Sequence, residues 1–233
     1  MSNHIISGLT IGQIIANDFR TASIFKKAGI DYYCGGNKSI SEACSEKGVD
    51  EYKLRKQLEV LADSPVNNAL NFKEWLPGLL CDYLTKTHHK FVLKSLPELV
   101  LYTGMIAEVH GEHHPELIEV ASLFAGINEE LFQHLAYEEE VLFPAIKAVE
   151  RNASLKGRST LVSQISRLQS EHEFVVRAMD KIKVLTQNYL IPEDSCNTYL
   201  VSLTLLEQFE DDLHIHIHLE NNILYPKVLS TAE

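Results

Sequence analysis

One eleven-residue pattern occurs twice in this chain and limits what the chain can fold into. It reads HLAYEEEVLFP from His134 to Pro144 and HIHLENNILYP from His216 to Pro226, so both copies have the form His-x-x-x-Glu-x-x-x-Leu-aromatic-Pro. A histidine and a glutamate four positions apart lie on the same face of an α-helix, one turn from each other. The pattern therefore predicts two helices that each present an imidazole and a carboxylate on one face.

The pattern is part of a longer repeat. His134 precedes His216 by 82 positions, and His89 precedes His172 by 83 positions. The chain thus contains two half-units, in which a helix with one inward histidine is followed by a helix with His-x-x-x-Glu. The ring of His172 is expected in a core, because it lies among apolar residues at helical spacing: Ile165, Leu168, Val175, Val176 and Met179.

The first of these helices carries two adjacent histidines, and its periodicity does not decide between them. His88 shares a helical face with Leu84 and other apolar residues upstream, whereas His89 shares one with Leu96 and other apolar residues downstream. The spacing alone leaves either ring as the inward one.

Six ionisable side chains would converge inside such a bundle. They are one ring of the 88–89 pair together with His134, Glu138, His172, His216 and Glu220. Burying so many ionisable groups without partners is costly, and two metal ions about 3–4 Å apart would bind them all. Each ion would take two histidines, with both glutamates bridging and coordination positions left for water, oxygen or another diatomic. The imidazole majority favours iron, manganese or zinc over magnesium or calcium, and it does not choose among these three.

The two other histidines of the HIHIH stretch fall on a different face of the predicted helix. His214 and His218 share it with Glu210 and with the asparagines at 221 and 222, whereas His216 shares an apolar face with Phe209 and Leu213. We therefore expect His214 and His218 in solvent.

Glycine content divides the chain into two regions. Residues 1–63 are interrupted by glycines, with short helices expected at 10–17, 20–28, 39–47 and 50–62, and with Gly35 and Gly36 allowing positive φ angles in a loop. Residues 64–70 are interpreted as a linker. From residue 71 onward glycines are sparse, and long helices are expected at 77–110, 116–150, 158–189 and 195–229, the first kinked or split by Pro97. Short connections favour an antiparallel packing, so the predicted fold class is all-α: a small helical N-terminal domain (1–63) followed by an antiparallel four-helix bundle (71–233).

Composition excludes several classes of function. The formal net charge of −11 disfavours binding to nucleic acid or to an anionic membrane, since both require basic patches. No run of eighteen apolar residues predicts a transmembrane helix, and the N-terminal residues do not resemble a signal peptide. The cysteines form no CxxC pair and no disulfide framework, so a reducing cytoplasm is the expected location; they are Cys34, Cys44, Cys81 and Cys196.

The motifs together resemble a known family. The bundle resembles a hemerythrin-like domain, and the whole chain resembles the repair-of-iron-centres proteins, in which a short ScdA-type N-terminal domain precedes that bundle. The segments that carry the resemblance are TIGQIIANDFRTASIFKKAGIDYYCGG, HHKFVLKSLPEL, VHGEHHPEL, HLAYEEEVLFP, SEHEFV and HIHLENNILYP. It implies a non-haem di-iron centre. It also implies His89 as the first-helix ligand, because the family ligand lies eight positions before the proline of LPEL, here Pro97. The remaining implied ligands are His134, Glu138, His172, His216 and Glu220.

The resemblance also implies a function. Family members restore iron–sulfur clusters damaged by nitric oxide or peroxide, so iron–sulfur proteins are the expected targets, and reduction of nitric oxide to nitrous oxide has been proposed for them. Two rival hypotheses remain: a carrier or sensor that binds oxygen or nitric oxide without turnover, and a structural bundle that holds zinc. The sequence leaves open whether the chain is an enzyme. A homodimer is expected, because small glycine-broken N-terminal domains often need a partner surface.

Two further carboxylates match family positions near the site. Glu130 and Glu171 are expected either to line a polar path to the metals or to be ordinary acidic groups around it.

The family loop commonly reads Cys-Cys-Gly-Gly, whereas this chain has Tyr33 followed by Cys34. No vicinal dithiol forms here, so Cys34 would act alone or with Cys44. Two other cysteines, Cys81 and Cys196, are expected to be in the core or inert.

Overall fold

The computed structural model describes residues 8–64, 71–152 and 158–230. It divides into two compact units. One is formed by Cys81–His216, and the other by Met1–Leu80 together with Ile217–Glu233. Residues 65–70 of the predicted 64–70 linker, and residues 153–157 between the second and third predicted long helices, lie outside the described residues.

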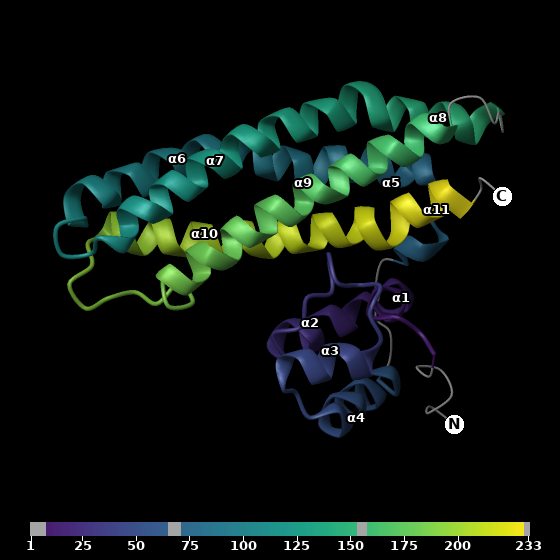
Figure 1. Cartoon of the computed structure of the whole chain (residues 1–233), viewed down its shortest axis with the longest axis horizontal. Coiled ribbons are helices and arrows are strands. Elements are labelled where there is room, and N and C mark those ends of the chain that lie inside the picture. Colours follow the sequence, from purple (N-terminus) through teal and green to yellow (C-terminus); the bar gives the residue numbers. More distant parts are fainter. Residues whose placement is uncertain (1–7, 65–70, 153–157, 231–233) are drawn as a thin grey trace. The chain divides into compact units, whose positions relative to one another are not determined.

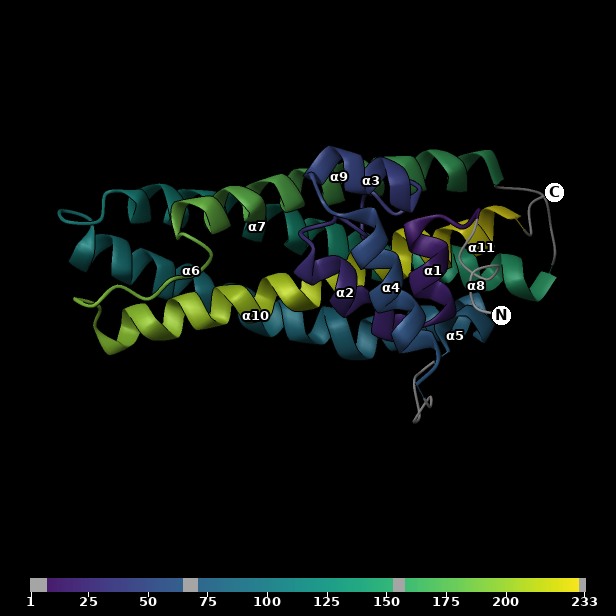
Figure 2. The same ribbon diagram turned by 90° about the horizontal axis from the view of Figure 1, so that it is seen from below.

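The first unit contains the bundle. Its long helices are α6 (Lys90–His110), α7 (Glu116–Tyr137), α9 (Arg158–Leu185) and α10 (Asn197–Leu219). Figures 1 and 2 show these helices side by side, with the chain running back and forth along them. The predicted all-α class and antiparallel four-helix bundle are therefore confirmed.

Apolar residues at helical spacing build the bundle core. On α7 they are Leu117, Val120, Phe124, Ile127 and Leu131, all at most 1% exposed. This spacing of three and four residues gives one continuous apolar stripe along the helix. Phe124 meets Phe209 of α10 edge-to-face, with ring centroids 5.4 Å apart. The core therefore fixes how the helices that carry the histidines face one another.

Three of the four predicted helices contain a short π-helical segment. The first is α5 (Pro77–Leu84), η4 (Thr85–His89) and α6; the second is α7, η5 (Glu138–Leu142) and α8 (Phe143–Asn152); the fourth is α10, η6 (Glu220–Leu224) and α11 (Tyr225–Ser230). Of the kink or split expected at Pro97, the split does not occur, because α6 runs through this residue. The third helix, α9, ends at Leu185 rather than 189, because residues 187–189 adopt positive φ angles of 50–61°.

The N-terminal region consists of short helical elements. They are α1 (Ile11–Asn17), η2 (Phe19–Thr21), α2 (Ala22–Lys27), α3 (Ile40–Lys47), α4 (Glu51–Ala62) and η3 (Phe72–Glu74). Thr10 and Ser39 begin α1 and α3 with capping boxes, in which the hydroxyl accepts from the third helical N–H. The described residues contain no β-strand and one isolated bridge, Thr10 to Ser39. Local caps rather than long apolar stripes therefore define these elements.

A close backbone approach explains one of the loop glycines. Neither Gly35 nor Gly36 has a positive φ angle, so that prediction is wrong. A Cβ atom on Gly36 would lie 2.1 Å from Oδ1 of Asn222 and 2.8 Å from the carbonyl oxygen of Tyr32. The Asn222 side chain in turn donates to the Tyr33 carbonyl at 2.9 Å. Glycine is required here for space rather than for backbone conformation.

Gly36→Ala should therefore destabilise the protein by about 1–3 kcal/mol, the usual cost of overpacking. Guanidinium denaturation followed by circular dichroism measures the change. Gly126→Ala is the matched control. It lies inside α7 with no heavy atom within 4 Å of the added Cβ, and should stabilise by up to about 1 kcal/mol. Equal effects of the two substitutions would contradict the close contact.

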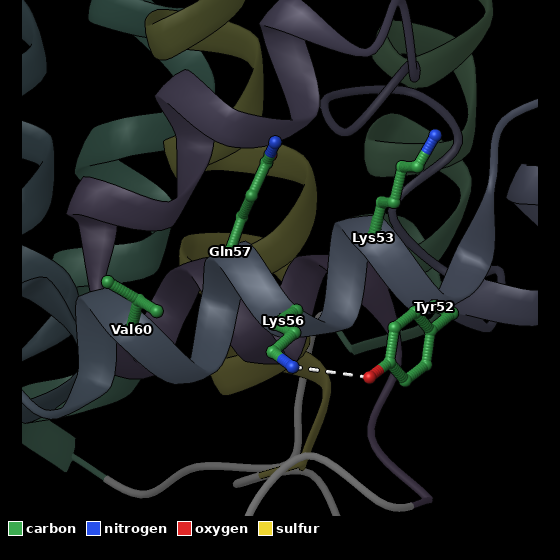
Figure 3. A pocket seen from close by; sticks show the side chains of 5 residues that line it. All are labelled: Tyr52, Lys53, Lys56, Gln57 and Val60. Carbon is green, nitrogen blue, oxygen red and sulfur yellow. Dashed lines mark hydrogen bonds between the residues drawn. The ribbon is translucent and has the colours of Figure 1, made fainter.

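The outer face of α4 carries a shallow hollow. Figure 3 shows its lining residues, all from this one helix: Tyr52, Lys53, Lys56, Gln57 and Val60. The Lys56 ammonium donates to the Tyr52 hydroxyl at 3.2 Å. Because all five residues come from a single helix, this hollow offers no converging set of chemical groups. In the described part of the chain, each helix is too short or too polar to cross a bilayer.

Candidate metal centre

The six side chains singled out by the repeat are buried in the structure. His89 ends η4, His134 lies in α7, Glu138 begins η5, His172 lies in α9, His216 lies in α10 and Glu220 begins η6. Each is at most 2% exposed. Four different stretches of helix therefore contribute to one site.

These residues form two overlapping groups whose ligand atoms all lie within 4.8 Å of one another. The groups are His89, Glu138, His216 and Glu220, and His134, Glu138, His172 and Glu220. Both glutamates belong to both groups, while the histidines divide in pairs. Oε2 of Glu138 lies 3.4 Å from Nε2 of His89 and 3.5 Å from Nε2 of His134. The arrangement suits two neighbouring cations with two bridging carboxylates.

Each π-helical segment has one end at a clustered residue: η4 ends at His89, η5 begins at Glu138 and η6 begins at Glu220. The wider turn is closed by the Phe143 N–H donating to the Glu138 carbonyl, and by the Tyr225 N–H donating to the Glu220 carbonyl. Proline follows each time, at 144 and 226. A proline ring inside an α-helix clashes with the carbonyl four residues earlier, and a π-turn removes that clash. The Leu-aromatic-Pro end of the repeat thus explains the local widening beside Glu138 and Glu220.

Two carboxylates outside the cluster hold the rings in place. Nδ1 of His89 lies 2.8 Å from Oε1 of Glu139, and Nδ1 of His134 lies 2.8 Å from Oε2 of Glu171. The hydrogen bond from His134 holds the pKa of the Glu171 carboxyl below its usual range. A histidine that donates from Nδ1 to a carboxylate presents the lone pair of Nε2 on the other side. In both residues that lone pair faces the cluster.

The donor set fits transition-metal ions. Nε2 of His134 and Nε2 of His172 face each other at 3.0 Å in a buried position. Four imidazoles with two carboxylates and no thiolate suit iron, manganese or zinc, and are too rich in nitrogen for magnesium or calcium. The described structure and the donor chemistry therefore support a metal site. The donors alone do not select iron.

Of the two adjacent histidines, His89 lies in the cluster and His88 does not. Nδ1 of His88 lies 3.0 Å from Oδ1 of Asp212, and the His88 ring stacks on that of His216 at 5.9 Å. The sequence interpretation identified neither Asp212 nor Glu139 as a partner of a histidine. Adjacency of Glu139 to Glu138 was the only signal available for it, because contacts between helices leave no local pattern.

The expected exposure of His214 and His218 is wrong. They are 5% and 0% exposed, because α10 buries a second face. Along that face, Glu210 accepts from the Lys183 ammonium of α9 at 2.7 Å. The His218 ring contacts those of Phe19 and Tyr32, with centroids 6.0 Å and 5.7 Å away. Burial lowers the pKa of His218 to about 4, so the ring is neutral at physiological pH.

The remaining predicted residues lie in different surroundings. Cys34 is half-buried in a loop, and its backbone N–H donates to Oδ1 of Asp31. Glu130 is half-buried and lies one turn before His134 in α7. Cys81 is buried, as expected. Cys196 is exposed, so a core position is wrong for this residue. The hydrogen bond from His110 lowers the pKa of its thiol to about 7.

The contact between Glu171 and His134 can be tested directly. Glu171→Ala should lower metal affinity by about 10–100-fold, the typical cost of removing a carboxylate that orients a ligating histidine. Competition with a coloured chelator measures the affinity. Glu173→Ala is the matched control two residues later on α9, because that carboxylate is exposed and forms a surface ion pair with Arg177. Equal affinities in both variants would show that Glu171 does not position the ring.

Comparisons with known proteins divide the chain into two matched regions. Residues 8–62 match the domain of unknown function DUF542, found at the N-terminus of ScdA. Residues 82–228 match the hemerythrin HHE cation-binding domain. The second match covers more than half of the chain and contains all six clustered residues.

Curated relatives match this chain along nearly its whole length. The iron–sulfur cluster repair protein ScdA of Staphylococcus haemolyticus is 30% identical over 93% of this chain and 96% of its own length. The iron–sulfur cluster repair protein YtfE of an Enterobacter species is 30% identical over 94% of this chain and 96% of its own length. The iron–sulfur cluster repair protein YtfE of Yersinia pestis is 33% identical over 90% of this chain and 91% of its own length. This chain, with its N-terminal DUF542 region and its hemerythrin HHE bundle, therefore belongs to the ScdA and YtfE family.

Proposed function

We propose that this protein holds a non-haem di-iron centre and repairs iron–sulfur clusters damaged by nitric oxide or peroxide. The observation that carries the proposal is the convergence of four imidazoles and two carboxylates in two overlapping, buried groups. The ScdA and YtfE relatives are named for iron–sulfur cluster repair, and their likeness spans at least 90% of the chain. Manganese and zinc satisfy the same donors and are outcomes of the metal analysis.

The proposed ligands divide between two iron ions. His89 and His216 would hold one ion, and His134 and His172 the other, with Glu138 and Glu220 contacting both. Carboxylates tolerate one or two bound cations, so the two glutamates can keep the pair together while ligands enter and leave. The proposed domains are residues 1–63, with the thiol of Cys34, and residues 71–233, with the metal centre.

The reduced iron pair, when bound, would supply electrons and open coordination positions for nitric oxide. Conversion of two nitric oxide molecules to nitrous oxide and water consumes two electrons and two protons. The side chain of Glu171 is 21% exposed and accepts from Nδ1 of His134, so it connects the buried ring with solvent. We assign Glu171 and Glu130 to the proton path, and Cys34 to a single-thiol step at the N-terminal domain.

The proposal includes a cellular setting. The expected location is the cytoplasm, the targets are iron–sulfur proteins, and the small-molecule ligands are nitric oxide and oxygen. The expected assembly is a homodimer of twice the chain mass of 26.3 kDa. Size-exclusion chromatography of the iron-loaded protein with light scattering measures that mass. A monomer at micromolar concentration would contradict the dimer.

A repair assay tests the function. An iron–sulfur dehydratase is inactivated by nitric oxide, separated from excess gas and incubated anaerobically with the iron-loaded protein and a reductant. Dehydratase activity should return, and it should not return with protein whose metal has been removed. Separately, anaerobic addition of nitric oxide should give several equivalents of nitrous oxide per chain. A stable nitrosyl adduct with neither nitrous oxide nor repair would identify a sensor instead.

A further inference from the structure

A cysteine–histidine pair lies at the opposite end of the bundle helices from the metal centre. Cys196 immediately precedes α10, and His110 is the last residue of α6. Sγ of Cys196 lies 3.1 Å from Nε2 of His110. About twenty residues of α10 separate Cys196 from His216, a distance of about 30 Å at 1.5 Å per residue. The pair is therefore a separate site and shares no residue with the proposed metal centre.

The surroundings of the pair favour a thiolate. The backbone N–H groups of Thr198 and Tyr199 donate to the sulfur at the start of α10, where helix geometry leaves such groups without carbonyl partners. The Tyr199 ring is 3% exposed and packs against the His110 imidazole, with centroids 5.3 Å apart. Tyr199 therefore restrains the ring that faces the sulfur.

A histidine and two carboxylates lie near the pair. The His114 ring also contacts that of Tyr199, with centroids 5.6 Å apart. Its two ring nitrogens lie 3.1 Å from a carboxylate oxygen of Glu116 and 3.2 Å from one of Asp194. These two carboxylates raise the pKa of His114. The hydrogen bond from His110, followed by the backbone N–H groups, lowers the pKa of Cys196 to about 7. About half of the thiol is then ionised at pH 7, compared with about 3% of a thiol with a pKa of 8.5.

We propose that Cys196 and His110 form a reactive-thiol site that hydrogen peroxide oxidises to a sulfenic acid. The thiolate attacks one peroxide oxygen, an S–O bond forms and the O–O bond breaks. The sulfur loses two electrons and the peroxide gains them. The departing hydroxide takes the proton of the His110 imidazolium and leaves as water. An uncharged oxidant fits this position, because Glu116 and Asp194 disfavour the approach of anionic disulfides.

The sulfenic acid should persist until a thiol from solution reduces it. The other cysteine of the bundle, Cys81, is 0% exposed. It precedes His110 by 29 residues of helix, about 43 Å at 1.5 Å per residue. Cys81 therefore cannot form a disulfide with Cys196 within one bundle.

The ionisation of Cys196 is tested by the pH dependence of its alkylation. The metal-loaded protein is treated with iodoacetamide between pH 5.5 and 9.5, and the peptide that contains Cys196 is quantified by mass spectrometry. The midpoint should lie near pH 7 in the wild type and above pH 8 in His110→Gln. His113→Gln is the matched control, because His113 is exposed three residues further along, and it should leave the midpoint unchanged. A wild-type midpoint at 8.5 or above, or one that His110→Gln does not move, would overturn the proposal.

The oxidation product is tested by trapping. One equivalent of hydrogen peroxide is added with dimedone, which captures sulfenic acids, and all four cysteines are followed by peptide mass spectrometry. Cys196 should carry most of the adduct, His110→Gln should reduce it several-fold at pH 6.5, and Cys196→Ser should abolish it. Labelling of Cys34 with none at Cys196 would refute the site. Neither assay depends on cluster repair, so failure of the reactive-thiol proposal can be distinguished from failure of the proposed function.

Discussion

Glu138→Ala should reduce the iron content of the protein from about two ions per chain to fewer than one. The Glu138 carboxylate belongs to both groups of candidate ligands and lies 3.4–3.5 Å from imidazole nitrogens of His89 and His134. Removing it takes a donor from both ions at once, whereas loss of one histidine affects a single ion. Iron is measured by mass spectrometry on protein prepared anaerobically from iron-replete cells.

Glu140→Ala is the matched control for this prediction. Glu140 lies in the same run of three glutamates but is exposed, so its removal should leave two ions in place. Alanine is the best helix former, and far-ultraviolet circular dichroism should show unchanged helix content in both variants. Retention of two ions by Glu138→Ala would show that this carboxylate is not a bridging ligand.

Removal of the metal should lower the free energy of unfolding by about 4 kcal/mol or more. A ligand that binds only the folded state stabilises it by about 4 kcal/mol when present at 1,000 times its dissociation constant. For a chain of this size, that loss corresponds to a decrease in Tm of about 10 °C. The physical cause is that six buried ionisable side chains lose the cations that offset their desolvation. Calorimetry of the iron-loaded and chelator-treated protein measures the difference.

The Glu138→Ala variant serves as the control for this experiment as well. Because it should already lack most of its iron, the chelator should change its Tm by only one or two degrees. A chelator effect of equal size in both proteins would indicate that the metal is bound elsewhere. An effect below about 1 kcal/mol in the wild type would contradict a metal-filled core.

The duplicated pattern was informative because it encodes both secondary structure and chemistry. The spacing of His134 and Glu138, repeated at His216 and Glu220, predicted the helices and placed four of the six clustered side chains on them. Periodicity did not choose between His88 and His89, because both rings are buried and lie on adjacent faces of the helix. Only the family resemblance selected His89, through its distance from Pro97.

Features that depend on contacts between distant segments could not be predicted. His214 and His218 lie on a face of α10 that has polar residues in the sequence, yet Lys183 and the Phe19 and Tyr32 rings cover parts of it. Gly36 is small because Asn222 lies against it, almost two hundred residues later. The contact between Cys196 and His110 could not be predicted, because no local motif indicates a residue 86 positions earlier. In each case the cause is tertiary packing, which local periodicity does not contain.

Mössbauer spectroscopy of protein purified anaerobically from cells grown on ⁵⁷Fe, combined with total metal analysis, tests the central claim most directly. We predict about two irons per chain and, after oxidation, quadrupole doublets of antiferromagnetically coupled ferric ions with no magnetic splitting at low temperature. A magnetically split spectrum of isolated high-spin ferric iron, or about two zinc ions per chain in place of iron, would contradict it.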